Sequence, residues 1–148
     1  MSEIEQQGPP AGWVEFAVDD PFQEHNGPLY VAEPFEATEE EPLRLGFRVA
    51  ERHCGFPGMC HGGMIATVLD NALGRSVQKA CGIDGAPTIS LHVDYMNAAR
   101  VGDWLESRVR ILRKTRRMVF LDALLIGPAG IIAKGSGVFR LPSARPAQ

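Results

Sequence analysis

The sequence predicts an α+β fold in which a curved antiparallel sheet of about five strands wraps around one long central helix. Two observations lead to this prediction. The segment from Cys60 to Lys79 is rich in good helix formers, contains no proline and is apolar around most of its circumference. One segment with alternating apolar residues precedes it, and four strand-like segments follow it. A helix of this kind needs cover on most sides, and a sheet bent around it would supply that cover.

The chain of 148 residues is long enough for one domain with a substantial core. Its two ends are polar and contain prolines. We therefore predict a flexible tail over residues 1–12, a single domain over residues 13–142 and a C-terminal tail over residues 143–148. No internal repeat and no second domain is visible in the sequence.

Five segments are predicted to be strands because they alternate between apolar and polar residues or are nearly continuously apolar. They are residues 43–49, 88–96, 104–112, 118–126 and 131–141. The most continuously apolar segment, 118–126, is predicted to lie in the middle of the sheet. The joins between the last four strands are short, which is typical of antiparallel neighbours. A small sheet of this kind leaves edge strands, so we expect dimerisation that continues the sheet.

Alternation assigns the side chains of segment 88–96 to two faces. Thr88 and Asp94 fall on the polar face, and Asp94 is thus a weak additional site candidate. The polar face also carries Ser90 and His92, whereas the opposite face carries Ile89, Leu91, Val93 and Tyr95.

The central helix is predicted to start at His61-Gly62-Gly63 and to end near Gly82. Two consecutive glycines leave backbone N–H groups uncovered at the positive end of the helix dipole, where an anion or a developing oxyanion can bind. Asp70 interrupts the apolar surface about two turns further on, at a rise of roughly 1.5 Å per residue. That separation is too large for both groups to act on one carbonyl within a single chain, although they could meet across a dimer. The alternative is that the glycines allow tight packing and Asp70 makes a buried hydrogen bond.

Composition argues against several other functions. The net charge of −3 argues against general nucleic-acid binding, and no apolar run is long enough to span a membrane. Three cysteines without an export signal predict free thiols and a cytoplasmic location. His53-Cys54 and Cys60-His61 carry possible zinc ligands, but adjacent pairs strain a tetrahedral site, and no metal is expected. Gly135-Ser136-Gly137 lacks the nucleophile elbow of serine hydrolases.

The segment Gly58-Met59-Cys60-His61-Gly62-Gly63, followed by Asp70, resembles the hotdog-fold acyl-CoA thioesterases, in particular the phenylacetate-pathway-like (PaaI-like) branch. The resemblance extends from about Asp20 to Leu141. It includes Asn26-Gly27-Pro28-Leu29, the run from Asp94 to Asp103 and a basic hairpin at residues 113–117 that precedes an apolar strand.

The resemblance implies hydrolysis of an acyl-CoA to a carboxylic acid and free CoA, with no cofactor besides the coenzyme A of the substrate. It also implies a homo-oligomer, a dimer or a dimer of dimers (a homotetramer), in which two subunits share each active site. The backbone N–H groups of Gly62 and Gly63 would polarise the carbonyl, and the partner's Asp70 would act as nucleophile or general base. His61 would shape the loop, and Thr88 would position the water or the acid.

The chain departs from this family at Gly55, where many relatives carry an Asn that contacts the carbonyl or the water. Gly55 has no side-chain donor, and losing one oxyanion donor costs about 3 kcal/mol. His53 and Asn71 are candidates to replace it. Arg113 and Arg116 either bind the CoA phosphates or belong to a solvated turn. The alternative function is a hotdog protein that binds acyl-CoA or an acyl carrier with weak or no catalysis.

Overall fold

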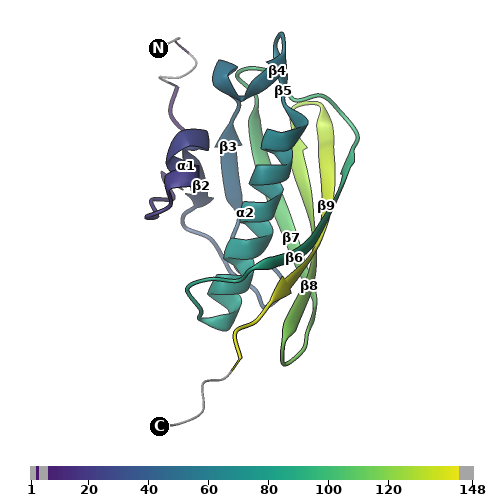
Figure 1. Cartoon of the computed structure of the whole chain (residues 1–148). Helices are drawn as coiled ribbons and strands as arrows, with labels where there is room; N and C mark the ends of the chain where they lie inside the picture. Colours follow the sequence, from purple (N-terminus) through teal and green to yellow (C-terminus); the bar gives the residue numbers. More distant parts are fainter. Residues whose placement is uncertain (1–2, 4–6, 144–148) are drawn as a thin grey trace.

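The computed structural model describes residue 3 and residues 7–143, and it confirms the predicted architecture of an antiparallel sheet that curves around one long helix (Figure 1). Seven strands form this sheet in the order β1-β2-β3-β7-β8-β9-β6, and β4 and β5 form a separate hairpin. The elements are β1 (Trp13–Glu15), α1 (Pro21–Asn26), β2 (Leu29–Ala32), β3 (Leu45–Arg48), a 3₁₀ turn (Glu51–His53), β4 (Cys54–Phe56), β5 (Met59–Cys60), α2 (Gly62–Cys81), β6 (Thr88–Tyr95), β7 (Trp104–Lys114), β8 (Met118–Gly127) and β9 (Gly130–Arg140).

The central helix α2 begins and ends as the sequence predicts. It starts at Gly62 and is closed by Gly82, whose φ of 62° is in the left-handed region that favours glycine. The buried residues of α2 recur every three or four positions, which gives one stripe that packs on the sheet. They include Met64, Ile65, Val68, Leu69, Ala72, Leu73 and Val77. The apolar circumference seen in the sequence is therefore covered by the sheet on one side only.

Two glycines of β9 let α2 lie close to the sheet. A Cβ at Gly137 would be 3.0 Å from the Leu73 side chain, and one at Gly135 would be 3.4 Å from Leu69. Both glycines belong to the Gly-Ser-Gly segment that sequence reasoning rejected as a nucleophile elbow. Their role here is close helix–sheet packing.

The sheet differs from the predicted one in size and in one connection. It has seven strands rather than about five, because β1 and β2 are too short to show an alternating pattern. The prediction that all short joins link neighbours is wrong for residues 97–103. Strand β6 pairs with β9 and not with β7, and the join instead pairs with β5 through a bridge between Met59 and Arg100. A short connection therefore does not always link two strands that pair with each other.

Strand β6 forms one edge of the sheet, in agreement with the prediction that the sheet leaves edge strands. Among the described residues it pairs only with β9. Ile89 and Tyr95 are 52% and 53% exposed, so the edge carries apolar surface. The predicted central position of residues 118–126 is confirmed, since β8 lies between β7 and β9.

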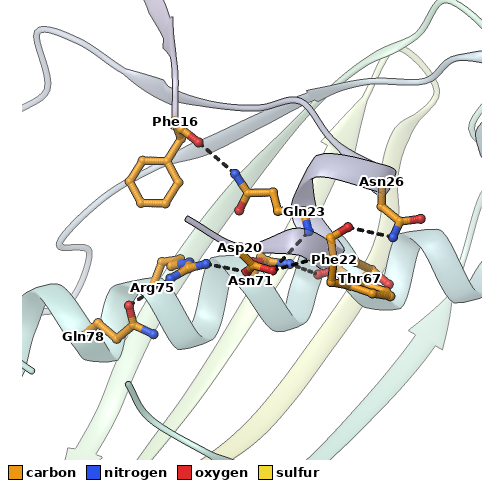
Figure 2. A network of polar contacts seen from close by, with 9 residues as sticks. All are labelled: Phe16, Asp20, Phe22, Gln23, Asn26, Thr67, Asn71, Arg75 and Gln78. Carbon is orange, nitrogen blue, oxygen red and sulfur yellow. Dashed lines mark hydrogen bonds and ion pairs between the residues drawn. The ribbon is translucent and has the colours of Figure 1, made fainter. Parts of the chain in front are cut away.

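The short helix α1 is fastened to α2 by one carboxylate (Figure 2). Asp20 Oδ1 accepts the N–H groups of Phe22 and Gln23, both at 3.1 Å, and thereby caps α1. Asp20 Oδ2 lies 2.8 Å from the Arg75 guanidinium on α2. Gln78 holds the other side of that guanidinium at 3.2 Å. This network fixes α1 against the central helix.

Candidate active site at the start of the central helix

The start of α2 presents one unused backbone donor. His61 is the N-cap residue, and its ring Nδ1 accepts the N–H of Gly63 at 2.8 Å. The N–H of Gly62 has no hydrogen-bond partner among the described residues, and the first helical turn contains no acidic side chain. Of the two amides named from the sequence, Gly62 is therefore the one available to bind an oxygen at the positive end of the helix.

Gly55 is a glycine because the ring of His61 lies against it. It is the extra residue of a β-bulge between β4 and β5, where Cys54 pairs with Cys60. A Cβ at Gly55 would lie 2.5 Å from His61 Cδ2, which is far inside ordinary contact. An Asn at this position is thus incompatible with the observed position of the His61 ring. The glycine that stands in place of the family Asn therefore occurs together with an N-cap residue, His61, whose ring lies against it.

Asp70 and Thr88, both named from the sequence, are in direct contact. The Thr88 hydroxyl donates to Asp70 Oδ1 at 2.7 Å. Alternation alone assigned Thr88 to the wrong face of β6. A β-bulge between Thr88 and Ser90 sets Thr88 opposite the inward-facing Phe139, so its hydroxyl reaches α2. Asp94 remains on the outer face, opposite Lys134, and does not approach the site.

Asp70 is half-buried rather than enclosed in the core. It lies on the side of α2 that faces the end of the edge strand β6, as its bond to Thr88 shows. Gly62 and Asp70 are eight residues apart in one helix, which corresponds to roughly 12 Å. The two groups therefore cannot contact the same carbonyl within one chain.

His53 does not replace the missing donor. Its side chain is only 5% exposed, and its ring packs edge-on against Phe47 at 4.7 Å between centroids. Nδ1 accepts the N–H of Ala50 at 2.9 Å, so the proton resides on Nε2, which donates to the Asn26 carbonyl at 2.8 Å. Both ring nitrogens are thus used by the backbone, so the His53 side chain has no spare donor for a carbonyl oxygen, and contact of His53 with substrate stays a prediction.

Asn71 also does not reach the start of the helix. Its amide donates to the Thr67 carbonyl one turn earlier at 3.0 Å. Figure 2 shows Asn71 on the side of α2 that faces α1. Asn71 therefore lies more than two helical turns from the Gly62 amide, whereas His53, whose carbonyl accepts the His61 N–H at 2.8 Å, lies close to it but has both ring nitrogens engaged.

Arg113 and Arg116 lie at the far end of the molecule. They belong to the β7–β8 hairpin, at the bottom of Figure 1, whereas β4, β5 and the start of α2 are at the top. Arg113 lines a cavity of about 700 Å³ together with Lys79, Lys114, Glu39 and Glu40. Within one chain, this cavity is at the opposite end of α2 from the Gly62 amide.

A second cavity, of about 390 Å³, adjoins the start of α2. It lies between α1 and the first turns of α2, and a cavity of this size can hold a small organic group. Its lining includes Phe22, Asn26, His61, Gly63, Met64 and Thr67. Phe22 was not identified from the sequence, because only the fold of α1 onto α2 brings it here.

The site therefore consists of an amide that can bind a carbonyl oxygen and a carboxylate with a hydroxyl partner. Such groups suit addition of water or carboxylate to a carbonyl, followed by expulsion of a leaving group. In the part of the chain that the structure describes, no three His, Cys, Asp or Glu side chains are grouped to hold a metal ion. None of the described helices has the length and apolar character needed to cross a membrane.

Sequence comparisons show which known proteins the chain is similar to. Residues 57–127 match the model of the thioesterase superfamily. A Pseudomonas aeruginosa protein whose name describes it provisionally as an esterase is 32% identical over 138 residues, covering 90% of this chain and 97% of that protein. Human acyl-coenzyme A thioesterase 13 is 29% identical over 92 residues, covering 60% of this chain and 64% of that enzyme.

Solved structures share the fold. Zebrafish thioesterase superfamily member 2 superposes with a TM-score of 0.72 at 24% identity, covering 84% of this chain and 89% of that one. A point mutant of the phenylacetic acid degradation protein PaaI from Thermus thermophilus gives 0.68 at 23% identity, covering 83% and 100%. A thioesterase-like protein of Streptococcus pneumoniae, solved with coenzyme A, gives 0.67 at 17% identity, covering 80% and 88%.

Proposed function

Because the chain belongs to the thioesterase superfamily, we propose that it hydrolyses an acyl-CoA to a carboxylic acid and free CoA at a site shared by two subunits. The thioesterase family seen in the sequence is confirmed, as is the hotdog fold, and the PaaI-like branch belongs to the proposal. The observation that most strongly supports the proposed activity is the Gly62 amide at the start of α2, which has no hydrogen-bond partner in the described part of the chain. In the same chain, Asp70 accepts a hydrogen bond from Thr88.

The contacts that β6 makes with α2 at both of its ends support a site shared by two subunits. Tyr95 contacts Gly62 at one end of β6, and Thr88 contacts Asp70 at the other. Suppose that the edge strands of two subunits pair antiparallel about a two-fold axis near the middle of β6. Tyr95 of one subunit would then lie opposite the partner's Thr88. The same pairing brings the Gly62 amide towards the partner subunit's Asp70, which one chain alone cannot do.

In this arrangement the Gly62 N–H binds the thioester carbonyl oxygen and stabilises the negative charge that develops on it. The partner's Asp70 either removes a proton from the attacking water or adds to the carbonyl itself. Collapse of the tetrahedral intermediate breaks the C–S bond and expels the CoA thiolate, which takes up the proton that Asp70 removed from the water. If Asp70 itself has added, collapse leaves a mixed anhydride, which water then hydrolyses to release the carboxylic acid and restore the Asp70 carboxylate, while the second proton of that water goes to the thiolate. Thr88 orients the carboxylate through its hydrogen bond of 2.7 Å.

The same two-fold pairing gives Arg113 and Arg116 a role. The β7–β8 hairpin of the partner would lie at the same end of the dimer as the Gly62 amide. Hairpin and amide would be separated by about three strand spacings, on the order of 15 Å at ~4.8 Å each. Guanidinium groups at that distance suit the phosphates of the carrier. The neighbour solved with coenzyme A supports the choice of carrier.

We also propose a cytoplasmic location and leave a dimer of dimers as the expected assembly. Cys54, Cys60 and Cys81 are free thiols. Free thiols in a chain with three cysteines suit a reducing compartment.

The first experiment measures CoA release from aryl, short-chain and long-chain acyl-CoAs. The wild-type protein is expected to hydrolyse at least one of them, and Asp70→Asn is expected to lose about 10²- to 10⁴-fold in kcat while remaining folded. Retention of activity by Asp70→Asn would rule out the proposed chemistry. If the wild-type protein binds CoA esters without hydrolysing any, the alternative of a binding protein replaces this proposal.

Subunit sharing is tested by complementation. Gly62→Pro removes the N–H donor at the first helical position, and the extended conformation of His61 (φ −62°, ψ 137°) is compatible with a following proline. A Cβ at this position would lie 3.3 Å from Tyr95 Cζ, so the Tyr95 ring has to shift by a few tenths of an ångström. Each heterodimer of Gly62→Pro with Asp70→Asn would contain one intact site and one doubly defective site. Random reassociation of equal amounts should restore about a quarter of wild-type activity. No recovery in a mixture that is shown to exchange subunits would contradict sharing.

A further inference from the structure

The donor amide of Gly62 lies in the most flexible backbone that a chain can provide. Gly62 and Gly63 are consecutive glycines at a helix start, and glycine loses more conformational freedom on folding than any other residue. An oxyanion donor acts well only when its direction is fixed before the reaction. Contacts from outside the helix must therefore hold this turn in place.

Two side chains hydrogen-bond to the peptide unit between Gly62 and Gly63, one to its N–H and one to its carbonyl oxygen. The N–H of Gly63 donates to His61 Nδ1 at 2.8 Å. The carbonyl of Gly62 accepts the hydroxyl of Tyr95 at 2.7 Å. A carbonyl oxygen has two lone pairs, so it can accept Tyr95 in addition to the helical bond. The N–H of Gly62, the proposed donor, is separated from this peptide unit by one Cα atom.

The ring of Tyr95 also limits the space around Gly62. A Cβ at Gly62 would lie 3.3 Å from Tyr95 Cζ and 3.4 Å from its hydroxyl oxygen. On the other side of the turn, the His61 ring rests against Gly55. The turn that carries the amide is thus enclosed from β6 on one side and from the β4–β5 hairpin on the other.

We propose that Tyr95 is a positioning residue that, through its hydroxyl, orients the Gly62 amide for binding of the thioester carbonyl. This role rests on the proposed function above. In this role Tyr95 does not touch the reacting atoms. Its hydroxyl fixes the plane of the Gly62–Gly63 peptide, which follows the Gly62 Cα. The Gly62 N–H, which precedes that Cα, is thereby held in one direction.

The test is Tyr95→Phe, which removes the hydroxyl and leaves the ring. The chain contains two tyrosines, so Tyr30→Phe is the matched control. Tyr30 lies in β2 against Trp104, with 5.4 Å between ring centroids, and is 8% exposed. Steady-state kinetics, hydrogen exchange of the peptide spanning residues 61–65, oligomer mass and urea unfolding are measured for both variants and the wild type.

For Tyr95→Phe we expect kcat to fall about three- to tenfold with KM unchanged, the effect of losing one hydrogen bond that acts on the transition state. Amide exchange over residues 61–65 should accelerate by about the same factor. Oligomer mass and the urea midpoint should stay close to wild type, and Tyr30→Phe should change neither kcat nor exchange at this peptide.

The proposal is overturned if Tyr95→Phe keeps wild-type kcat, or if kcat falls while exchange over residues 61–65 is unchanged. A rise in KM alone would assign Tyr95 to substrate binding and would also overturn it. If the wild-type protein hydrolyses no acyl-CoA, the proposed function fails. The exchange measurement then decides by itself whether Tyr95 holds the turn.

Discussion

Replacing Gly55 by Asn tests whether the N-cap arrangement explains the glycine. Introducing the side chain that many relatives carry would seem to restore a lost donor. In this structure, however, a Cβ at Gly55 would lie 2.5 Å from His61 Cδ2. Ordinary carbon–carbon contacts begin near 3.4 Å, so the His61 ring would have to withdraw by about 1 Å.

The cost of that withdrawal can be derived from the contacts of His61. Its Nδ1 accepts the N–H of Gly63 at 2.8 Å, and a shift of this size breaks the bond. Loss of an N-cap costs about 1 kcal/mol, and crowding a packed position costs about 1–3 kcal/mol. The His61 side chain can partly relieve the crowding, since its surroundings are exposed. We therefore expect Gly55→Asn to lower the free energy of unfolding by about 1–3 kcal/mol.

Urea unfolding and CoA release provide the assay. The midpoint should fall for both Gly55→Ala and Gly55→Asn, and activity should fall as well because the start of α2 is disturbed. Gly85→Ala is the control, since a Cβ there meets nothing within 4 Å; it should stay within about 0.5 kcal/mol of wild type. If Gly55→Asn unfolds like the wild type and hydrolyses acyl-CoA faster, the glycine is simply a missing donor and this reasoning is refuted.

Two further predictions concern a thiol and the outer face of the sheet. Burial, with a smaller effect of neighbouring Cys54, raises the pKa of Cys60 to about 12. Only the thiolate reacts with iodoacetamide, so the rate of Cys60 alkylation should rise about tenfold per pH unit from about pH 8 to 11. Peptide mass spectrometry measures this rate, and a plateau below about pH 10 would contradict the pKa. A Cβ at Gly46 would collide with the Trp104 ring, which is packed against Trp13. Gly46→Ala should therefore lower the free energy of unfolding by about 2–3 kcal/mol. Urea titration followed by tryptophan fluorescence measures this change, and a wild-type midpoint would mean that the Trp104 ring can move aside.

Local sequence patterns were sufficient for the elements that carry the site. The helix over Gly62–Cys81 was predicted from its composition, its glycine start and Gly82, because capping and helix periodicity involve residues close together in the chain. Strands β3, β6, β7, β8 and β9 were predicted from their alternating or apolar runs for the same reason. His61, Gly62 and Asp70 could be selected from these local signals and from the family resemblance.

Long-range contacts explain what the sequence did not reveal. Strict alternation put Thr88 on the outer face of β6, and only the bulge in its pairing with β9 turns it towards Asp70. His53 looked like a spare donor, yet its ring is consumed by the backbone of Ala50 and Asn26. Neither fact is encoded in the spacing of nearby residues.

The sequence alone thus determined the helix, its glycine start, five strands of the sheet and the family. The tertiary structure decided that β6 is an edge strand, that Tyr95 closes over Gly62, and that Arg113 lies at the opposite end of α2. The physical reason is the range of the interactions. Periodicity and capping act over a few residues, whereas strand order, register shifts and contacts between β6 and α2 join residues far apart in the chain.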